Sequence, residues 1–159
     1  MHLTLDCRPR WPHNSEVSYR VGIINVTGFA GMEAARLLWN HPQARITSIT
    51  GRSLAGQRLG EAFPHLAVYG DMLISAEIEG DVDVVMSALP TAESALACAP
   101  YVRAGIKVID IAADFRLKTA AAFETWFGKP HPAPERLPEA VYGRPELNLS
   151  LIPISDPTR

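Results

Sequence analysis

The sequence predicts an α/β domain built on a doubly wound parallel sheet. Short apolar segments alternate with helix-like segments, which is the pattern of parallel strands joined by crossover helices. Some strand-like segments are continuously apolar, such as Val84-Val85-Met86, and such strands are typical of a sheet covered by helices on both faces. With 159 residues, of which 47% are hydrophobic and 20% charged, the chain is large enough to bury one core without disulfides or metal.

Runs of apolar and β-branched residues bounded by turn residues predict the strands. We place them at residues 19–24, 45–50, 82–87 and 107–111, with a further short strand at 72–74. Residues 51–70 contain four glycines and Pro64, so we expect a loop there that includes one helical turn.

Three segments carry helical patterns. The first begins near Phe29 and ends before Pro42, because proline disfavours helix at the residue that precedes it. Its buried face is expected to hold Ala30, Ala34, Leu37, Leu38 and His41. The third helix spans residues 120–127 and ends at Gly128.

The second helix is predicted at residues 91–103. Thr91 is the expected N-cap, Pro100 should kink the helix or end it early, and Gly105 follows its last turn. Seven of the 13 prolines lie between Pro130 and Pro157, so we expect an extended and irregular C-terminal part.

Composition argues against several classes of protein. The net charge of −2 and the pI near 6.2 disfavour nucleic acid or an anionic membrane as the main partner. The sequence contains no run of 18 apolar residues, so no membrane span is predicted, and residues 1–20 lack the apolar core of a signal peptide.

The cysteines and histidines predict neither a disulfide framework nor a metal site. Cys7 and Cys98 are too few for either, and the five histidines show no ligand spacing. Cys98 lies among small apolar residues, so we interpret it as a core residue and not as a nucleophile. A chain with so few cysteines is expected in the reducing cytoplasm.

The turn between the first strand and the first helix predicts a dinucleotide-binding, Rossmann-like fold. Such a turn needs glycines for a tight bend, for close approach of a pyrophosphate and for packing of the helix on the strand. Gly28 and Gly31 stand at the second and third glycine positions, and Asn25, which tolerates left-handed angles, stands at the first. The helix start would offer free N–H groups to a diphosphate. The cofactor-binding residues predicted here are Asn25, Thr27, Gly28, Phe29, Ala30 and Gly31.

The end of the second strand favours NADP(H) over NAD(H). An NAD site usually has an Asp or Glu here to bind the ribose 2′-hydroxyl, but this stretch has Arg52 and Ser53 and no carboxylate. A guanidinium pairs well with a 2′-phosphate, and the serine hydroxyl is a further donor. The alternative is a solvated surface arginine.

Two further loops follow predicted strands. Ala88, Leu89 and Pro90 lie where the ligand crevice of such a sheet would be, and they suit either a cofactor contact or an ordinary loop. Asp114 and Arg116 follow the last strand, and we expect a buried ion pair between them that fixes the loop.

These segments together resemble N-acetyl-gamma-glutamyl-phosphate reductase, an enzyme of arginine biosynthesis. The resemblance covers residues 19–148 and rests on five separated motifs in the family's order. They are Val21–Gly31, Gly51–Gly56 with Phe63–Leu66, Ala88–Pro90, Val108–Leu117 and Ala140–Leu147. The last motif distinguishes this family from aspartate-semialdehyde dehydrogenase. Asn25, Ala112 and Arg144 depart from the usual glycine, serine and leucine, and Asn25 is expected to loosen pyrophosphate binding.

The resemblance implies a division of the chain and an incomplete catalytic apparatus. We expect an extension at 1–18, a dinucleotide-binding domain at 19–148, and a non-native tail at 149–159 that resembles a translated sequencing adapter. The family's nucleophilic cysteine and its acid–base histidine would follow residue 148 and have no match here, so no catalytic residue is assigned. We therefore expect a truncated gene model.

The implied activity is NADPH-dependent reduction of N-acetyl-gamma-glutamyl phosphate to N-acetylglutamate 5-semialdehyde. In the family a thiolate displaces phosphate to give a thioester, which hydride then reduces. This chain would supply the NADP-binding half and be inactive alone, and a homo-oligomer is expected only for the full-length protein. The alternatives are a stand-alone NADP(H)-binding module and a reductase of a related acyl phosphate, aspartyl or carrier-bound aminoadipyl.

Overall fold

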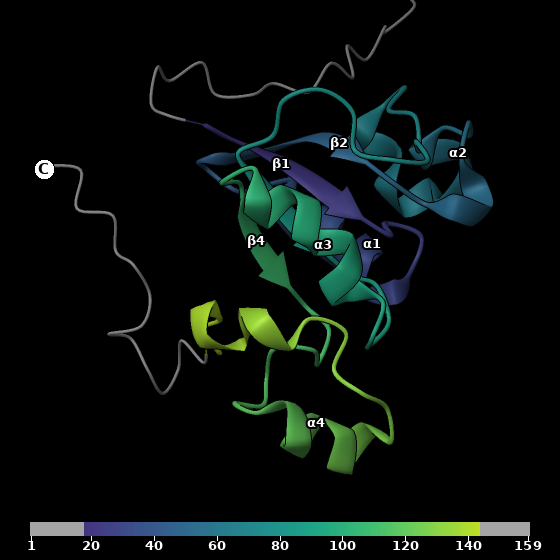
Figure 1. Cartoon of the computed structure of the whole chain (residues 1–159). Helices are drawn as coiled ribbons and strands as arrows, with labels where there is room; N and C mark the ends of the chain where they lie inside the picture. Colours follow the sequence, from purple (N-terminus) through teal and green to yellow (C-terminus); the bar gives the residue numbers. More distant parts are fainter. Residues whose placement is uncertain (1–17, 144–159) are drawn as a thin grey trace, which may run out of the picture.

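A four-stranded parallel sheet forms the centre of the molecule (Figure 1). The computed structural model describes residues 18–143. The strands are β1 (Tyr19–Ile24), β2 (Ala44–Ile49), β3 (Val84–Ser87) and β4 (Lys107–Asp110), in the order β2-β1-β3-β4. Ile23 of β1 pairs with Ile49 on one side and with Met86 on the other. The predicted α/β class with a parallel, Rossmann-like sheet is confirmed.

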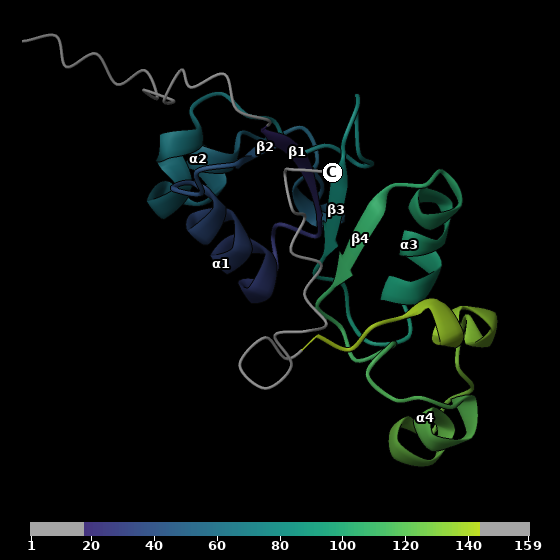
Figure 2. The same ribbon diagram turned by 90° about the vertical axis from the view of Figure 1, so that its left-hand side faces the viewer.

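Helices cover both faces of this sheet. Helix α1 (Phe29–Leu38) connects β1 to β2, and helix α3 (Ser94–Arg103) connects β3 to β4 in the opposite direction along the sheet. Right-handed crossovers in opposite directions place their helices on opposite faces. Figure 2 shows α1 on one side of the sheet and α3 on the other. The sheet is therefore doubly wound, as predicted.

The buried face of α1 differs from the predicted one. Gly31, Ala34 and Ala35 are buried, whereas Ala30 is exposed and Leu37 is 60% exposed. The reason is close packing at Gly31, where an added Cβ would lie 2.8 Å from the Cα of Val26. The helix turns its smallest side chains toward the strand, and the larger Leu37 faces outward. It also ends at Leu38, before the predicted His41.

The segment after β2 contains more helix than the glycine-rich sequence suggests. It forms two short 3₁₀ helices, η1 (Arg52–Leu54) and η2 (Pro64–Tyr69), on either side of helix α2 (Leu59–Ala62). Leu59, Leu66 and Ile74 are buried in the core, which explains why the segment is ordered.

The strand predicted at residues 72–74 was wrong. Leu73 makes an isolated antiparallel bridge with Arg58, and Ser75 makes a parallel bridge with Thr50. The backbone bonds of this segment are therefore satisfied locally, by the loop and by the end of β2.

A distant carboxylate caps the start of α3. The predicted N-cap Thr91 was wrong, because the helix begins at Ser94 and no side chain of its own cap residue Glu93 bonds to it. Instead the buried carboxylate of Asp114 accepts hydrogen bonds from the backbone N–H groups of Ala92, at 2.7 Å, and Ala95, at 2.9 Å. The negative charge also suits the positive end of the helix.

The predicted ion pair between Asp114 and Arg116 was also wrong. The guanidinium of Arg116 donates a hydrogen bond to the carbonyl oxygen of Ile111 instead. Helix α3 does not end at Pro100 and continues to Arg103, with Gly105 just beyond it at a φ of 76°.

Helix α4 (Ala120–Phe127) lies beyond the carboxyl end of β4 (Figure 1). Thr119 caps it by accepting a hydrogen bond from the N–H of Ala122, and Gly128 ends it at a φ of 64°. The predicted bounds of this helix are confirmed. The buried His131 packs against Phe123 and bonds the carbonyl oxygen of Asp114, so this histidine has a structural role.

A last short 3₁₀ helix, η3 (Pro134–Glu139), precedes the end of the described part. Except for Ser18, the predicted extension at 1–18 lies outside the described residues, as do the predicted tail at 149–159 and Arg144. Within residues 18–143 we find no helix long and apolar enough to cross a membrane.

Candidate functional site

The strand order reverses between β1 and β3. From β1 the chain moves to β2 on one side, and it later returns to β3 on the other side. In open parallel sheets, ligands bind at the carboxyl ends of the strands at such a switch point. The loops at this point contain Asn25 and Ala88.

Asn25 adopts the left-handed conformation that the first glycine position requires, with a φ of 64°. Its Nδ2 donates a hydrogen bond to the carbonyl oxygen of Ala88 at 2.9 Å, and its Oδ1 accepts one from the hydroxyl of Thr27 at 3.2 Å. The expectation that asparagine tolerates this turn is confirmed. The side-chain bridge to Ala88 was not anticipated.

The two glycines of the loop have different roles. Gly31 lies beneath the loop, where α1 packs on the backbone of Val26. Gly28 precedes α1 in an extended conformation, and no side chain among the described residues caps the helix there. Phe29 and Ala30 in its first turn are exposed. The N-terminus of α1 therefore presents free N–H groups toward solvent, as an anion site requires.

A cavity of about 610 Å³ lies beside this loop. It is bordered by the ends of β1 and β2 and by α3, and it brings together six of the predicted cofactor residues. These are Asn25, Thr27, Arg52, Ser53, Leu89 and Pro90. Sequence reasoning missed the other lining residues, among them Glu77, Glu93 and Tyr101. None of them belongs to a recognisable motif: Glu77 comes from the segment between β2 and β3, Glu93 precedes α3 and Tyr101 lies on α3, and the tertiary fold brings them together.

Arg52 lies at the edge of this cavity and is 82% exposed. Its Nη1 lies 3.7 Å from Oε2 of Glu93, which precedes α3. Burial and the charge of Glu77 raise the pKa of the Tyr101 hydroxyl. Charged groups of both signs thus border a partly apolar cavity.

A second cavity, of about 300 Å³, lies on the other side of the loop after β3. Its lining includes Ala30 and Ala88 and shares Leu89 and Pro90 with the first cavity. Arg116 also lines it and is its only charged lining residue among those described. The remaining predicted residues, Gly28, Phe29 and Gly31, line neither cavity and form the start of α1.

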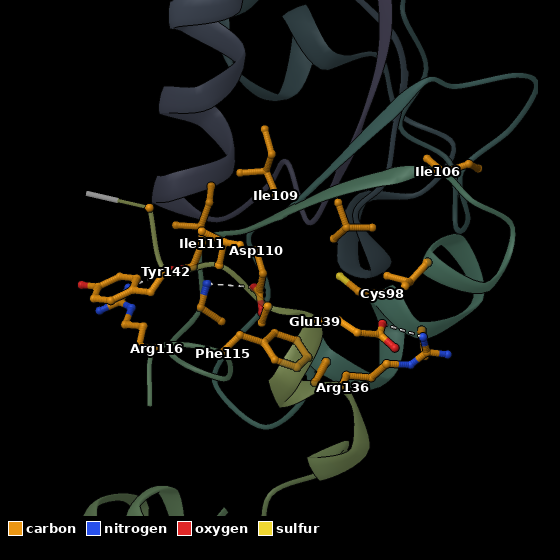
Figure 3. A pocket seen from close by; sticks show the side chains of 18 residues that line it. Cys98, Ile106, Ile109, Asp110, Ile111, Phe115, Arg116, Arg136, Glu139 and Tyr142 are labelled. Atoms are coloured by element: carbon orange, nitrogen blue, oxygen red, sulfur yellow. Dashed lines mark hydrogen bonds and ion pairs between the residues drawn. The ribbon is translucent and has the colours of Figure 1, made fainter. Parts of the chain in front are cut away.

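Figure 3 shows a third cavity, of about 740 Å³, between α3, β4 and η3. One oxygen of Asp110 accepts hydrogen bonds from Ser94 and from the N–H of Ala112, while the buried Oδ2 has no partner among the described residues. Burial raises the pKa of Asp110. Cys98 faces this region but is only 2% exposed, and burial raises the pKa of its thiol. The interpretation of Cys98 as a core residue is confirmed.

No cluster of three or more metal-ligating side chains occurs among residues 18–143. The histidines at 2 and 13 and Cys7 lie outside the described residues.

The protein-family model described as semialdehyde dehydrogenase, NAD binding domain, matches residues 20–153, which is most of the chain. The chain belongs to this family. The switch-point loop, the uncapped start of α1 and the adjoining cavity are thus parts of an NAD(P)-binding domain.

Similar proteins narrow the relationship further. N-acetyl-gamma-glutamyl-phosphate reductase of Dehalococcoides mccartyi is 51% identical over 129 residues, which are 81% of this chain and 38% of that protein. The enzyme of the same name from Azotobacter vinelandii is 43% identical over 133 residues, 81% of this chain and 39% of that protein. The chain is a homologue of these reductases, and it spans about 38% of their length.

A solved structure supports the fold. Aspartate semialdehyde dehydrogenase with NADP from Candida albicans aligns with a TM-score of 0.54 and 23% identity, covering 64% of this chain and 32% of that one. At this identity the likeness concerns the fold alone.

Proposed function

We propose that this domain binds NADP(H), as the cofactor-binding part of an N-acetyl-gamma-glutamyl-phosphate reductase. The observation that carries the proposal is the position of Arg52 and Ser53. Both lie directly after β2, at the edge of the cavity beside the switch-point loop. A guanidinium with a neighbouring hydroxyl suits a 2′-phosphate. The relatives named as this reductase, with up to 51% identity, supply the substrate class.

The residues present fit the cofactor. The start of α1 has no side-chain cap, and a Cβ added at Gly28 would lie 3.1 Å from the side-chain nitrogen of Asn25 and 3.7 Å from its backbone oxygen. Glycine at this position avoids that contact with Asn25, and the N–H groups of the first helical turn would hold a pyrophosphate. Arg52 and Ser53 would hold the 2′-phosphate, and Tyr101 offers an aromatic surface in the same cavity.

The bound cofactor would supply the hydride for reduction of an acyl group, and the described residues bind and orient it. Arg116 is the only charged lining residue of the second cavity among those described, and it would pair there with a phosphate-bearing substrate. We also propose that the whole protein acts in the cytoplasm on N-acetyl-gamma-glutamyl phosphate and assembles as a homo-oligomer.

Calorimetric titration of the 159-residue chain with NADP⁺ and NAD⁺ tests the cofactor assignment. The wild type should bind NADP⁺ more tightly. Arg52→Ala should weaken NADP⁺ binding by about 1.5–3 kcal/mol, or roughly 10- to 150-fold, and leave NAD⁺ binding nearly unchanged. Arg58→Ala is the matched control, because Arg58 is also an exposed arginine with acidic partners but lines none of these cavities. Equal affinities for both cofactors in the wild type would contradict the proposal.

A further inference from the structure

The cavity beside the switch-point loop holds charges that oppose one another. Its charged lining residues are Arg52, Glu77 and Glu93, so two carboxylates accompany one guanidinium. A phosphate monoester carries about −1.5 to −2 charges near neutral pH. A 2′-phosphate entering this cavity therefore meets one attractive and two repulsive groups.

Glu93 is the carboxylate that contacts Arg52. The two side chains come from different elements, η1 after β2 and the residue before α3, and their closest charged atoms are 3.7 Å apart. The backbone of Glu93 is fixed, because its N–H donates to the carbonyl of Pro90 at 3.1 Å and its carbonyl accepts from Ala97 at 3.2 Å. The carboxylate is thus held at the edge of the cavity, within reach of the guanidinium.

The contact is weak enough to be displaced. Arg52 is 82% exposed and Glu93 53% exposed, and at 3.7 Å the pair is an ion pair without a close hydrogen bond. Exposed ion pairs of this kind contribute little, whereas a phosphate can form two short charge-assisted bonds with a guanidinium. A 2′-phosphate would therefore take Arg52 away from Glu93.

We propose that Glu93 is a positioning residue that lowers the selectivity of this domain for NADP(H), by competing with the 2′-phosphate for Arg52. This inference rests on the proposed function, in which the cavity receives the adenosine end of the cofactor. NAD(H) has no 2′-phosphate and does not displace the ion pair. The Arg52–Glu93 contact therefore penalises only the phosphorylated cofactor, and Glu93 brings the two affinities closer together.

The test is Glu93→Gln in the full chain, with dissociation constants measured for NADP⁺ and NAD⁺, and for 2′,5′-ADP and 5′-AMP as adenosine-end probes. NADP⁺ and 2′,5′-ADP should bind about two- to five-fold more tightly, the range expected for loss of an exposed ion pair. NAD⁺ and 5′-AMP should change by less than the error. A purely structural role of Glu93 would alter all four constants together and leave their ratio unchanged.

The control is Glu61→Gln, which removes the same charge from an ion pair of similar length, 3.6 Å to Arg58, outside the cavity. It should leave the ratio of the NAD⁺ and NADP⁺ constants unchanged. In an Arg52→Ala background, Glu93→Gln should tighten NADP⁺ binding less, because there is no guanidinium for which Glu93 and the 2′-phosphate can compete. An unchanged ratio in Glu93→Gln, the same change in Glu61→Gln, or a full gain without Arg52 would each overturn the inference.

The two proposals fail in different ways. A wild type that binds NADP⁺ no more tightly than NAD⁺ refutes the proposed function, and the inference with it. A wild type that prefers NADP⁺, with a ratio that Glu93→Gln does not alter, refutes only the role of Glu93.

Discussion

The side-chain amide of Asn25 and the backbone carbonyl of Ala88 are joined by a hydrogen bond of 2.9 Å, which links the loops after β1 and β3 across the switch point. Asn25 has a φ of 64°, so it adopts the left-handed conformation that the first glycine position requires and adds a hydrogen bond that glycine lacks. Asn25 therefore stabilises the two loops that border the candidate cofactor site.

Substitutions at Asn25 separate these two roles. Asn25→Gly keeps the left-handed conformation and loses the two side-chain hydrogen bonds, to Ala88 and from Thr27, so the free energy of unfolding should fall by about 1–2 kcal/mol. Asn25→Ala loses the same two bonds and also adopts an unfavourable φ, at a further cost of roughly 1–2 kcal/mol. Urea denaturation of the three proteins measures the difference. Equal stability of the two variants would show that φ at this position carries no strain.

The sequence predicted the backbone of this loop but not its side-chain contacts. Glycine spacing and the tolerance of asparagine for left-handed angles are local properties, and so they could be read from residues 25–31. The bond to Ala88 joins residues 63 positions apart and depends on the order of the strands. The same distinction explains why Arg52 was found as a candidate and Glu93 was not.

The errors in the fold have a similar origin. The strands were found because short runs rich in apolar and β-branched residues lie between turn residues, whereas the start of α3 was misplaced because its cap comes from Asp114. The one helical turn expected within residues 51–70 corresponds to α2, but the flanking 3₁₀ helices were missed, since buried residues such as Leu66 are held by tertiary burial and not by helix propensity. Sequence rules therefore predict the elements whose backbone hydrogen bonds and caps come from nearby residues, and they fail where distant residues provide them.

Gly28 and Gly31 should respond differently to an added methyl group. At Gly31 the Cβ would overlap the backbone of Asn25 and Val26, so Gly31→Ala should lower the free energy of unfolding by about 1–3 kcal/mol. At Gly28 the nearest atom is the side-chain nitrogen of Asn25, at 3.1 Å, which needs to shift only a few tenths of an ångström, so Gly28→Ala should still fold at a smaller cost than Gly31→Ala. Gly28→Val should also fold but lose most NADP⁺ binding. Thermal melts and calorimetry measure the two effects, and normal binding by Gly28→Val would place the pyrophosphate elsewhere.

Asp114 should matter for stability far more than Arg116. The buried carboxylate accepts two backbone N–H groups at the start of α3, and in Asp114→Asn one of them faces an amide donor. The expected loss is about 1–3 kcal/mol of unfolding free energy. Arg116→Ala should cost less than about 0.5 kcal/mol, because it removes one exposed hydrogen bond to Ile111. Similar losses of stability in both variants would contradict this prediction and would favour the ion pair between Asp114 and Arg116 that the sequence suggested.

Acid stability should depend on Asp83. Hydrogen bonds from the side chain and backbone of Arg20 hold the pKa of Asp83 at about 2, below the usual value near 3.9. Because the folded pKa is the lower one, this stabilisation is present above about pH 4 and disappears as the pH falls toward 2. The wild type should lose more stability over that window than Asp83→Asn. The carboxylate is exposed, so added salt should reduce the difference, and parallel pH curves for the two proteins would contradict the assignment.

Cys98 should behave as a buried thiol and not as a nucleophile. Burial raises the pKa of its thiol, and the nearby hydroxyls of Ser87 and Ser94 offset this only in part, so little thiolate is present at pH 8. In a Cys7→Ser background, alkylation of the native chain at pH 8 should be on the order of ten-fold slower than in urea, or slower still. Cys98→Ser should retain NADP⁺ binding, and we expect no phosphate-dependent oxidation of N-acetylglutamate semialdehyde by the chain. Turnover that Cys98→Ser abolishes, or rapid alkylation of the native thiol, would instead make Cys98 a reactive group that borders the third cavity.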